Sequence, residues 1–251
     1  MKTRFFFSAL LPALLSLTLS AQDLSSSRSG FLSAGTLHMK GFASDSELVR
    51  GPLFSVGSRT VREKSSITTV NDAEFGLGFT SNRNRQDLSL MLKPVDLIVG
   101  YNLPLGPARI AVGPAFLLEY DSRFMRDYPG AFDSWQAELS FGLAVLASFP
   151  VGNSFIDIKL RNSISGLVCR NEIYHDDLTY DIFPLRFLRD IHQNGRTLNP
   201  GNYNRTCFEV QFTPSSQSAI SFAYGADFVR FRGNPESGKF SQSVRIYINA
   251  R

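Results

Sequence analysis

The chain has 251 residues, of which 43% are hydrophobic, 12% aromatic and 19% charged. This composition excludes a collagen, a low-complexity disordered chain and a coiled coil. The mean hydropathy of -0.06 is too low for a polytopic helical membrane protein. The formal net charge is +4, and it is not gathered into a basic stripe, so the sequence gives no reason to expect a nucleic-acid partner.

Residues 1–21 have the pattern of a secretory signal peptide. Two cations precede an apolar run from Phe5 to Leu19, and Ala21 provides a small residue at the cleavage site. The apolar run is shorter than the ~20 residues that a membrane-spanning helix needs. We therefore expect residues 1–21 to be removed on export and residues 22–251 to form a single domain.

After the signal peptide, apolar and polar residues alternate with a period of two, which indicates β-strands. In the clearest run, residues 134–151, the odd positions from Trp135 onward are apolar, and even positions such as Gln136 and Ser140 are small or polar. This run is far longer than the ~5–6 residues of an ordinary globular strand. The pattern predicts ten strands, near residues 30–42, 53–62, 67–81, 86–103, 108–122, 134–150, 155–169, 205–213, 218–232 and 239–250.

Two of the predicted strands depart from simple alternation. In the fourth strand the apolar residues change from even to odd positions at Lys93-Pro94, which predicts a β-bulge where proline can be tolerated. The second strand, residues 53–62, has no clean apolar face. Eight or twelve strands therefore remain open alternatives to ten.

The turns between the predicted strands alternate in length. Long strands with an apolar outer face, short turns at one end and long loops at the other are typical of transmembrane barrels. We predict an all-β fold, a transmembrane antiparallel up-and-down β-barrel with a long external loop at residues 170–203. A soluble β-sandwich or lipocalin-like barrel would also alternate and is the other fold considered. The short turns are expected at Leu103–Ala108, Val151–Ser154 and Pro214–Ser218, and the long ones at Ser122–Asp133, Arg170–Tyr203 and Gly233–Gly238.

With its signal-peptide pattern, its long alternating strands and the glycines on their inner faces, the chain resembles small outer-membrane β-barrel proteins of Gram-negative bacteria. The resemblance covers the chain after residue 21 and rests on pattern, not on a specific motif. The final residue, Arg251, departs from the terminal aromatic residue that such proteins commonly carry. The resemblance implies a monomer in the cell outer membrane, without a cofactor. Its partners would be outer-membrane lipid, lipopolysaccharide and, during biogenesis, the barrel-insertion machinery.

The inward positions of the predicted strands carry charges of both signs. Because an unpaired buried charge is costly, we expect these side chains to pair across the interior. A lumen plugged in this way favours a structural or surface-binding role, and a narrow passive channel for small polar solutes is the alternative. His38 is also expected to face the lumen. The predicted charge network consists of Arg109, Glu119, Glu138, Asp157, Lys159, Arg161, Glu209, Asp227 and Arg245, with Asp121 on the same parity.

Cys169 and Cys207 bracket the long loop. Because the exported chain reaches a compartment that permits oxidation, we expect a disulfide at the base of the loop. Two buried free thiols are the alternative.

The long loop suggests a third function, hydrolysis at the mouth of the barrel. Asp190 and His192 form an Asp-x-His, and Asp176 and Asp177 follow His175. Asp190 and His192 are similar to the Asp–His pair of omptin-type outer-membrane proteases, which are ten-stranded barrels that also use a pair of aspartates at the mouth. Here the two aspartates are adjacent instead of spaced. The sequence favours a non-enzymatic role over an omptin-like protease or a lipid-modifying enzyme, and it predicts no metal site.

Arginines recur in the predicted outer loops. Guanidinium groups bind phosphate well, so these residues suggest contact with lipid A or with sugar phosphates, although they are equally expected as solvated loop charges. They are Arg83, Arg85, Arg123, Arg126, Arg186, Arg189 and Arg196.

Overall fold

The computed structural model describes residues 25–40, 48–83, 86–125, 133–170, 196–232 and 237–250. The strands are β1 (Ser25–Lys40), β2 (Leu48–Lys64), β3 (Ile67–Ser81), β4 (Gln86–Leu105), β5 (Ala108–Met125), β6 (Asp133–Val151), β7 (Ser154–Arg170), β8 (Arg196–Leu198), β9 (Tyr203–Thr213), β10 (Ile220–Phe231) and β11 (Ser237–Ala250). Within these ranges, no helix has the length and apolarity for a membrane crossing.

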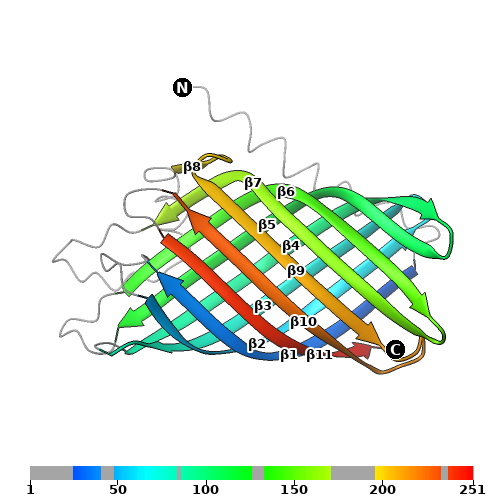
Figure 1. Ribbon diagram of the computed structural model, residues 1–251, viewed down its shortest axis with the longest axis horizontal. Helices are drawn as coiled ribbons and strands as arrows, with labels where there is room; N and C mark the ends of the chain where they lie inside the picture. Colours follow the sequence, from blue (N-terminus) through cyan, green and yellow to red (C-terminus); the bar gives the residue numbers. More distant parts are fainter. Residues whose placement is uncertain are drawn as a thin grey trace.

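The strands form one antiparallel sheet that closes into a barrel (Figure 1). Neighbours follow the order β6-β5-β4-β3-β2-β1-β11-β10-β9-β7-β8, and the additional pairing of β6 with β7 closes the wall. Ten of the strands are long, and β8 has three residues. The predicted all-β, ten-stranded antiparallel barrel is therefore confirmed.

Tight turns join the strands at one end of the barrel, where β1 begins and β11 ends (Figure 1). We call this the short-turn end and the opposite one the far end. Gly106 and Gly152 lie in two of these turns with φ of 61° and 62°, which glycine adopts without a Cβ clash. The short turns span residues 65–66, 106–107, 152–153 and 214–219.

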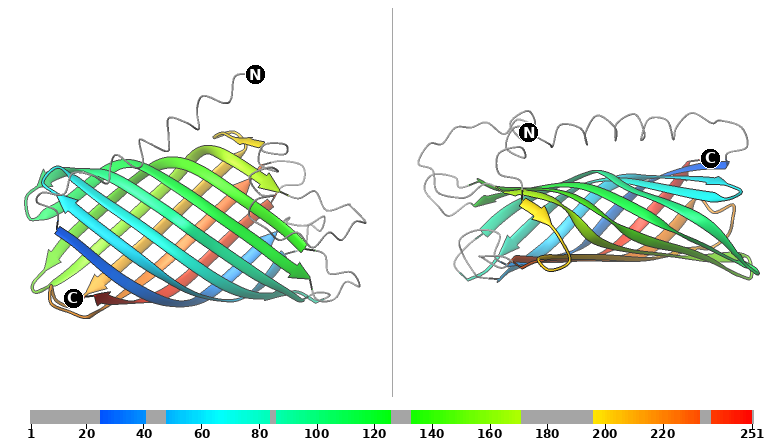
Figure 2. Two further views of the ribbon diagram at one scale, coloured as in Figure 1. Left: turned by 180° about the vertical axis from the view of Figure 1, so that it is seen from behind. Right: turned by 90° about the horizontal axis from the view of Figure 1, so that it is seen from above.

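The alternation of each strand places large apolar side chains outside the barrel and polar ones inside. Leu32 and Val244, for example, are 59% and 56% exposed on the outer face, whereas the adjacent Ser33 and Ser243 are buried. Figure 2 shows the closed wall from behind and from above. An apolar outer face around a polar interior is the arrangement that a lipid environment favours.

The parity change at Lys93-Pro94 is a β-bulge, as the sequence predicts. The pairing of β4 with β5 shifts register between Leu92 and Val95. Asp96 follows Lys93 by three positions, so simple alternation would place the two side chains on opposite faces. Because of the bulge, both are buried inside the barrel. The bulge thus adds a cation and an anion to the interior.

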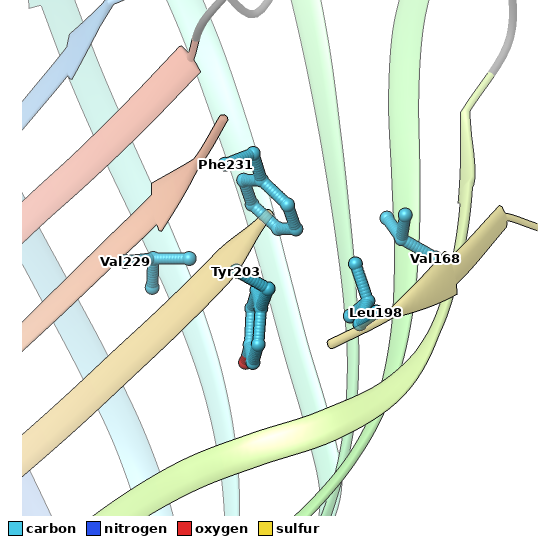
Figure 3. Packing of buried hydrophobic residues seen from close by; sticks show 5 residues of the cluster. All are labelled: Val168, Leu198, Tyr203, Val229 and Phe231. Carbon is cyan, nitrogen blue, oxygen red and sulfur yellow. The ribbon is translucent and has the colours of Figure 1, made fainter. Parts of the chain in front are cut away.

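A second bulge, in β7, reverses the orientation that simple alternation would give to Val168. The pairing of β7 with β6 shifts opposite Phe141 and Gly142, which leaves Ile164 as the extra residue. Before the bulge, the even-numbered positions of β7 face outward, and Val168 is even-numbered. After the bulge, however, Val168 is 5% exposed and lies within an inner apolar cluster (Figure 3). The cluster also contains Leu198, Tyr203, Val229 and Phe231.

The expectation that His38 faces the lumen is wrong. Its neighbours Leu37 and Met39 are buried in an apolar cluster on the inner face, so alternation turns His38 outward. There its ring lies 5.9 Å from the ring of Phe240, centroid to centroid. The inward positions of β1 are apolar near the far end, which concealed their direction in the sequence.

β8 and β9 lie along the same edge of β7, as one strand with an interruption (Figure 1). β7 pairs with β9 over Phe155–Ser163 and with β8 over Gly166–Val168. Between them, residues 199–202 leave the sheet. The backbone N–H groups of Asn202 and Tyr203 donate to the Asn199 carbonyl at 3.0 and 2.9 Å and close this excursion. Strand pairing therefore resumes at Arg196, before the end expected for the long loop.

Candidate functional site

Charged side chains of both signs fill the middle of the barrel interior. Each lies within 4.0 Å of at least one opposite charge. We call this set the ionic network. Its cations are Arg59, Lys93, Lys159, Arg161, Arg205, Lys239 and Arg245, and its anions are Asp72, Glu74, Asp96, Glu119, Asp121, Glu138, Glu209 and Asp227.

Arg59 is the centre of the half nearer the short-turn end. Its Nε and Nη2 atoms donate to the two carboxylate oxygens of Asp72, both at 2.7 Å, and its Nη1 lies 2.7 Å from Glu209. Lys159 also donates to Asp72, at 2.6 Å. Arg245 donates to Glu209 at 3.0 Å. These contacts link five strands across the interior, because each residue comes from a different one.

Arg205 is the centre of the half nearer the far end. Its side chain is 0% exposed, and its Nη2 lies 2.5 Å from both Glu119 and Asp227. Its Nη1 is 3.2 Å from Glu138, and Lys239 donates to Glu119 at 2.6 Å. A single guanidinium thus neutralises carboxylates from three strands.

Lys93, which the bulge turns inward, joins the two halves. Its Nζ lies 3.3 Å from Asp227, 3.4 Å from Glu119 and 3.8 Å from Glu74. The cavity beside it has a volume of about 30 Å³ and is lined by charged network residues and by uncharged ones such as Met91, Ser243 and Cys207. That volume is of the order of one water molecule.

Toward the short-turn end, the interior widens into a cavity of about 1230 Å³, which we call the vestibule. Arg59, Lys159 and Glu209 of the ionic network line its inner end, and Asp157 lies in its wall. Its rim carries many neutral polar side chains from both ends of the chain, among them Ser27 and other serines. The vestibule can hold small polar molecules, and the ionic network lies between it and the far end.

The structure brings together seven of the nine charged residues that the sequence predicts for the interior. Asp157 lies in the vestibule wall, where it accepts a hydrogen bond from Ser148. Arg109 is a correction: its side chain is 79% exposed and lies 3.1 Å from Glu63. Arg109 lies at the rim because it is close to the start of β5, directly after the turn. The seven are Glu119, Glu138, Lys159, Arg161, Glu209, Asp227 and Arg245.

Several network residues escaped the sequence analysis. Asp72 and Glu74 share the even inward parity of β3 and could have been found by the alternation used elsewhere. Arg59 lies in the strand without a clean apolar face. Arg205 and Lys239 lie near predicted strand ends, where the alternation has too few residues to define a direction. The full set missed is Arg59, Asp72, Glu74, Lys93, Asp96, Arg205 and Lys239.

The structure does not bring the two cysteines together. Cys207 is free and pairs with Arg161 on β7, whereas Cys169 lies further along β7, opposite Ala137 of β6. Eight positions on one strand correspond to about 26 Å, and a disulfide needs Cα atoms less than ~7 Å apart. The expected Cys169–Cys207 disulfide therefore does not agree with this register.

The proposed hydrolase residues His175, Asp176, Asp177, Asp190 and His192 lie outside the described residues. Within the described ranges, no group of three or more His, Cys, Asp or Glu side chains could hold a metal ion.

Arg123, expected in an outer loop, is instead buried. Its Nη2 lies 3.3 Å from the Met39 sulfur and its Nη1 3.8 Å from Asp87. β5 continues further than the sequence indicates, which carries Arg123 into the wall of the barrel.

Comparisons with known proteins identify the architecture. No protein-family model and no curated protein matches the chain. Among solved structures, it is similar to the outer membrane protease OmpT from Escherichia coli, with 7% identity and a TM-score of 0.51, covering 92% of this chain and 98% of that one.

Two further similar structures have lower scores. The translocator domain of the autotransporter NalP from Neisseria meningitidis has 8% identity and a TM-score of 0.48, covering 96% of this chain and 94% of that one. An outer membrane channel from Pseudomonas putida F1 has 11% identity and a TM-score of 0.40, covering 92% and 97%. At these identities the likeness concerns the fold and no activity. The closed ten-stranded antiparallel wall and the likeness to OmpT together show that the chain has the fold of Gram-negative outer-membrane β-barrel proteins.

Proposed function

We propose that the protein is a monomeric outer-membrane β-barrel with a plugged lumen and a structural or surface-binding role at the cell surface. Its partners would be the membrane lipids, including lipopolysaccharide, and the insertion machinery during assembly. The observation that carries the proposal is the ionic network, because it joins strands from all around the wall through the centre of the barrel.

The contacts of the network favour a closed interior. Opening a pore would separate Arg59 from Asp72 and Glu209, or Arg205 from its three carboxylates. Breaking a buried ion pair leaves an uncompensated charge, at a cost of about 3–5 kcal/mol for one partner. Such a plug is expected to hold the lumen shut and to fix the shape of the barrel for its outer loops.

A second candidate, a narrow passive channel, is supported by the vestibule. Its volume of about 1230 Å³ would admit small polar solutes from the short-turn end. The two candidates differ in whether the ionic network lets such solutes continue to the far end.

Planar-bilayer conductance separates the two candidates. The unmodified protein should show no steady conductance. The charge-neutral double substitution Arg59→Ala with Asp72→Ala should introduce one, because it removes a whole pair from the plug. The matched control is Arg109→Ala with Glu63→Ala, which removes a pair at the exposed rim and should leave the bilayer silent. Steady conductance of the unmodified protein would establish the channel instead.

The location has its own test. The protein should be recovered with the outer-membrane fraction, and its unboiled form should migrate faster in SDS gels than the boiled form, as a folded barrel does. Recovery in the soluble fraction without detergent would contradict the proposal.

A further inference from the structure

The charges on the outer face of the barrel have one sign. Where the structure describes the side chain at an outward strand position, every charged residue found there is a cation, and each carboxylate whose side chain is described in these strands takes an inward position. The outward cations are Arg28, Arg62 and Lys64 toward the short-turn end, and Lys40, Arg50 and Arg230 toward the far end.

The three cations at the far end lie on neighbouring strands. Arg230 of β10 pairs in register with Gly238 of β11, which pairs with Lys40 of β1. Arg50 of β2 lies opposite His38, two positions from Lys40 on the same face. Adjacent strands are ~4.8 Å apart, so Arg230 and Lys40 stand about 10 Å apart across the intervening β11. That separation lets both side chains reach one phosphate-sized group.

Gly238 leaves a notch between these two cations. It has no side chain, and a Cβ built on it would approach only the Val229 carbonyl oxygen, at 3.4 Å. Gly238 therefore places no side chain between Arg230 and Lys40, and both of these cations are exposed. We call Lys40, Arg230 and Gly238, together with Arg50, the cationic notch.

The surface next to the notch is aromatic and then apolar. Phe228 and Phe240 pair with each other one outward position closer to the middle of the barrel, and the Phe240 ring contacts His38. The next outward pair is Ala226 and Gln242, and the pair after it is Tyr224 and Val244, which are 46% and 56% exposed. The Tyr224 hydroxyl donates to the Gln242 side chain at 2.9 Å. A molecule that combined a phosphate with hydrocarbon chains would match this order of cations, aromatic rings and apolar side chains.

We infer that the cationic notch binds the phosphate group of a lipid in the leaflet at the far end of the barrel. This inference rests on the proposed outer-membrane location and names a binding site for its lipid partner. Lys40 and Arg230 contact the phosphate from either side of Gly238, and Arg50 adds a third positive charge. The acyl chains lie over Phe240 and the apolar face below it. In an outer membrane, the lipid that fits is the phosphorylated lipid A of lipopolysaccharide.

The test is native mass spectrometry of the folded full-length protein titrated with lipid A, and with lipid A from which the phosphates have been removed. The phosphorylated lipid should bind more tightly to the unmodified protein. Lys40→Gln with Arg230→Gln should weaken that binding by about tenfold, because the double substitution removes two exposed ionic contacts that each contribute modestly to the binding free energy. The dephosphorylated lipid should bind both proteins alike. Inorganic phosphate at the same concentration should not compete, because it lacks the apolar contacts.

The matched control is Arg28→Gln with Lys64→Gln, which removes two outward cations from the short-turn end and should keep the phosphate preference. Equal effects of the two double variants, or no preference for the phosphorylated lipid, would overturn the inference. Competition by inorganic phosphate would replace the lipid site with a simple anion site and overturn it too. Failure of the proposed function is distinguishable, because a chain that is not a membrane barrel would bind neither form of lipid and would show no heat-dependent gel shift.

Discussion

Arg205 shows how a single residue can hold the interior of this barrel together. The side chain is completely buried, and three carboxylates from β5, β6 and β10 surround its guanidinium. Tyr203, two residues earlier, donates its hydroxyl hydrogen bond to one of them, Glu138. Buried charges are tolerated when they are paired and hydrogen-bonded. Arg205 contributes to the pairing of all three carboxylates, and it shares Glu119 with Lys93 and Lys239 and Asp227 with Lys93.

Replacing Arg205 with Met should therefore destabilise the folded barrel strongly. The substitution keeps apolar volume but leaves buried carboxylates short of a cation, and we expect a loss of about 3–5 kcal/mol. Arg109→Met, which removes an exposed rim pair, should cost less than about 1 kcal/mol. Urea unfolding in detergent, followed by the fluorescence of the single tryptophan, Trp135, measures both. Equal losses would show that the buried network adds no stability.

The cysteines give a second prediction at this scale. Because the register separates Cys169 from Cys207, both should react quantitatively with a thiol reagent in denaturant without prior reduction. Labelling is counted by mass spectrometry, with a fully reduced sample as the reference. Protection of both thiols until a reductant is added would restore the disulfide and require a different register for β7.

At the scale of single strands, close approach between neighbours depends on particular glycines. Gly142 of β6 lies beside the bulge of β7, and a Cβ there would stand 1.9 Å from the Asn162 carbonyl oxygen. Gly225 of β10 has space, since its Cβ would be 3.7 Å from the nearest atom, the Phe208 carbonyl oxygen. The tight curvature of β6 against β7 therefore requires glycine at the first position and not at the second.

Gly142→Ala should lower the free energy of unfolding by about 1–3 kcal/mol, because the two strands must move apart. Gly225→Ala should change it by less than about 0.5 kcal/mol. The same urea unfolding assay compares the two variants. A stable Gly142→Ala protein would mean that β6 and β7 do not approach as closely as described.

The sequence predicts individual strands well where alternation is long and clean. Residues 67–81 match β3 as predicted, and the bulge at Lys93-Pro94 is visible because seven apolar residues define the two parities. The bulge at Ile164 is not, since an extra isoleucine looks like one more outward apolar residue. The sequence also does not predict which charged residues pair with each other, because the pairing depends on how strands far apart in the chain face each other across the interior.

For the molecule as a whole, the outer apolar face predicts how substitutions respond to lipid. Val244 lies at the middle of β11 and Ile220 at the first position of β10, both exposed. Arginine at the middle of a spanning strand costs ~2–4 kcal/mol, and near the interface ~0–1 kcal/mol. Val244→Arg should therefore lower stability in lipid vesicles by the larger amount and Ile220→Arg by the smaller, as measured by reversible urea unfolding. Equal costs would contradict a membrane-embedded belt.

The excursion at residues 199–202 divides the segment that pairs with β7 into two independently paired strands, β8 and β9. The pairing of β8 and that of β9 with β7 each have their own register, and the turn between them closes on its own hydrogen bonds. Extra residues between Pro200 and Gly201 would therefore shift neither strand. A short epitope inserted there would report, by antibody staining of intact cells, which side of the envelope this end of the protein faces.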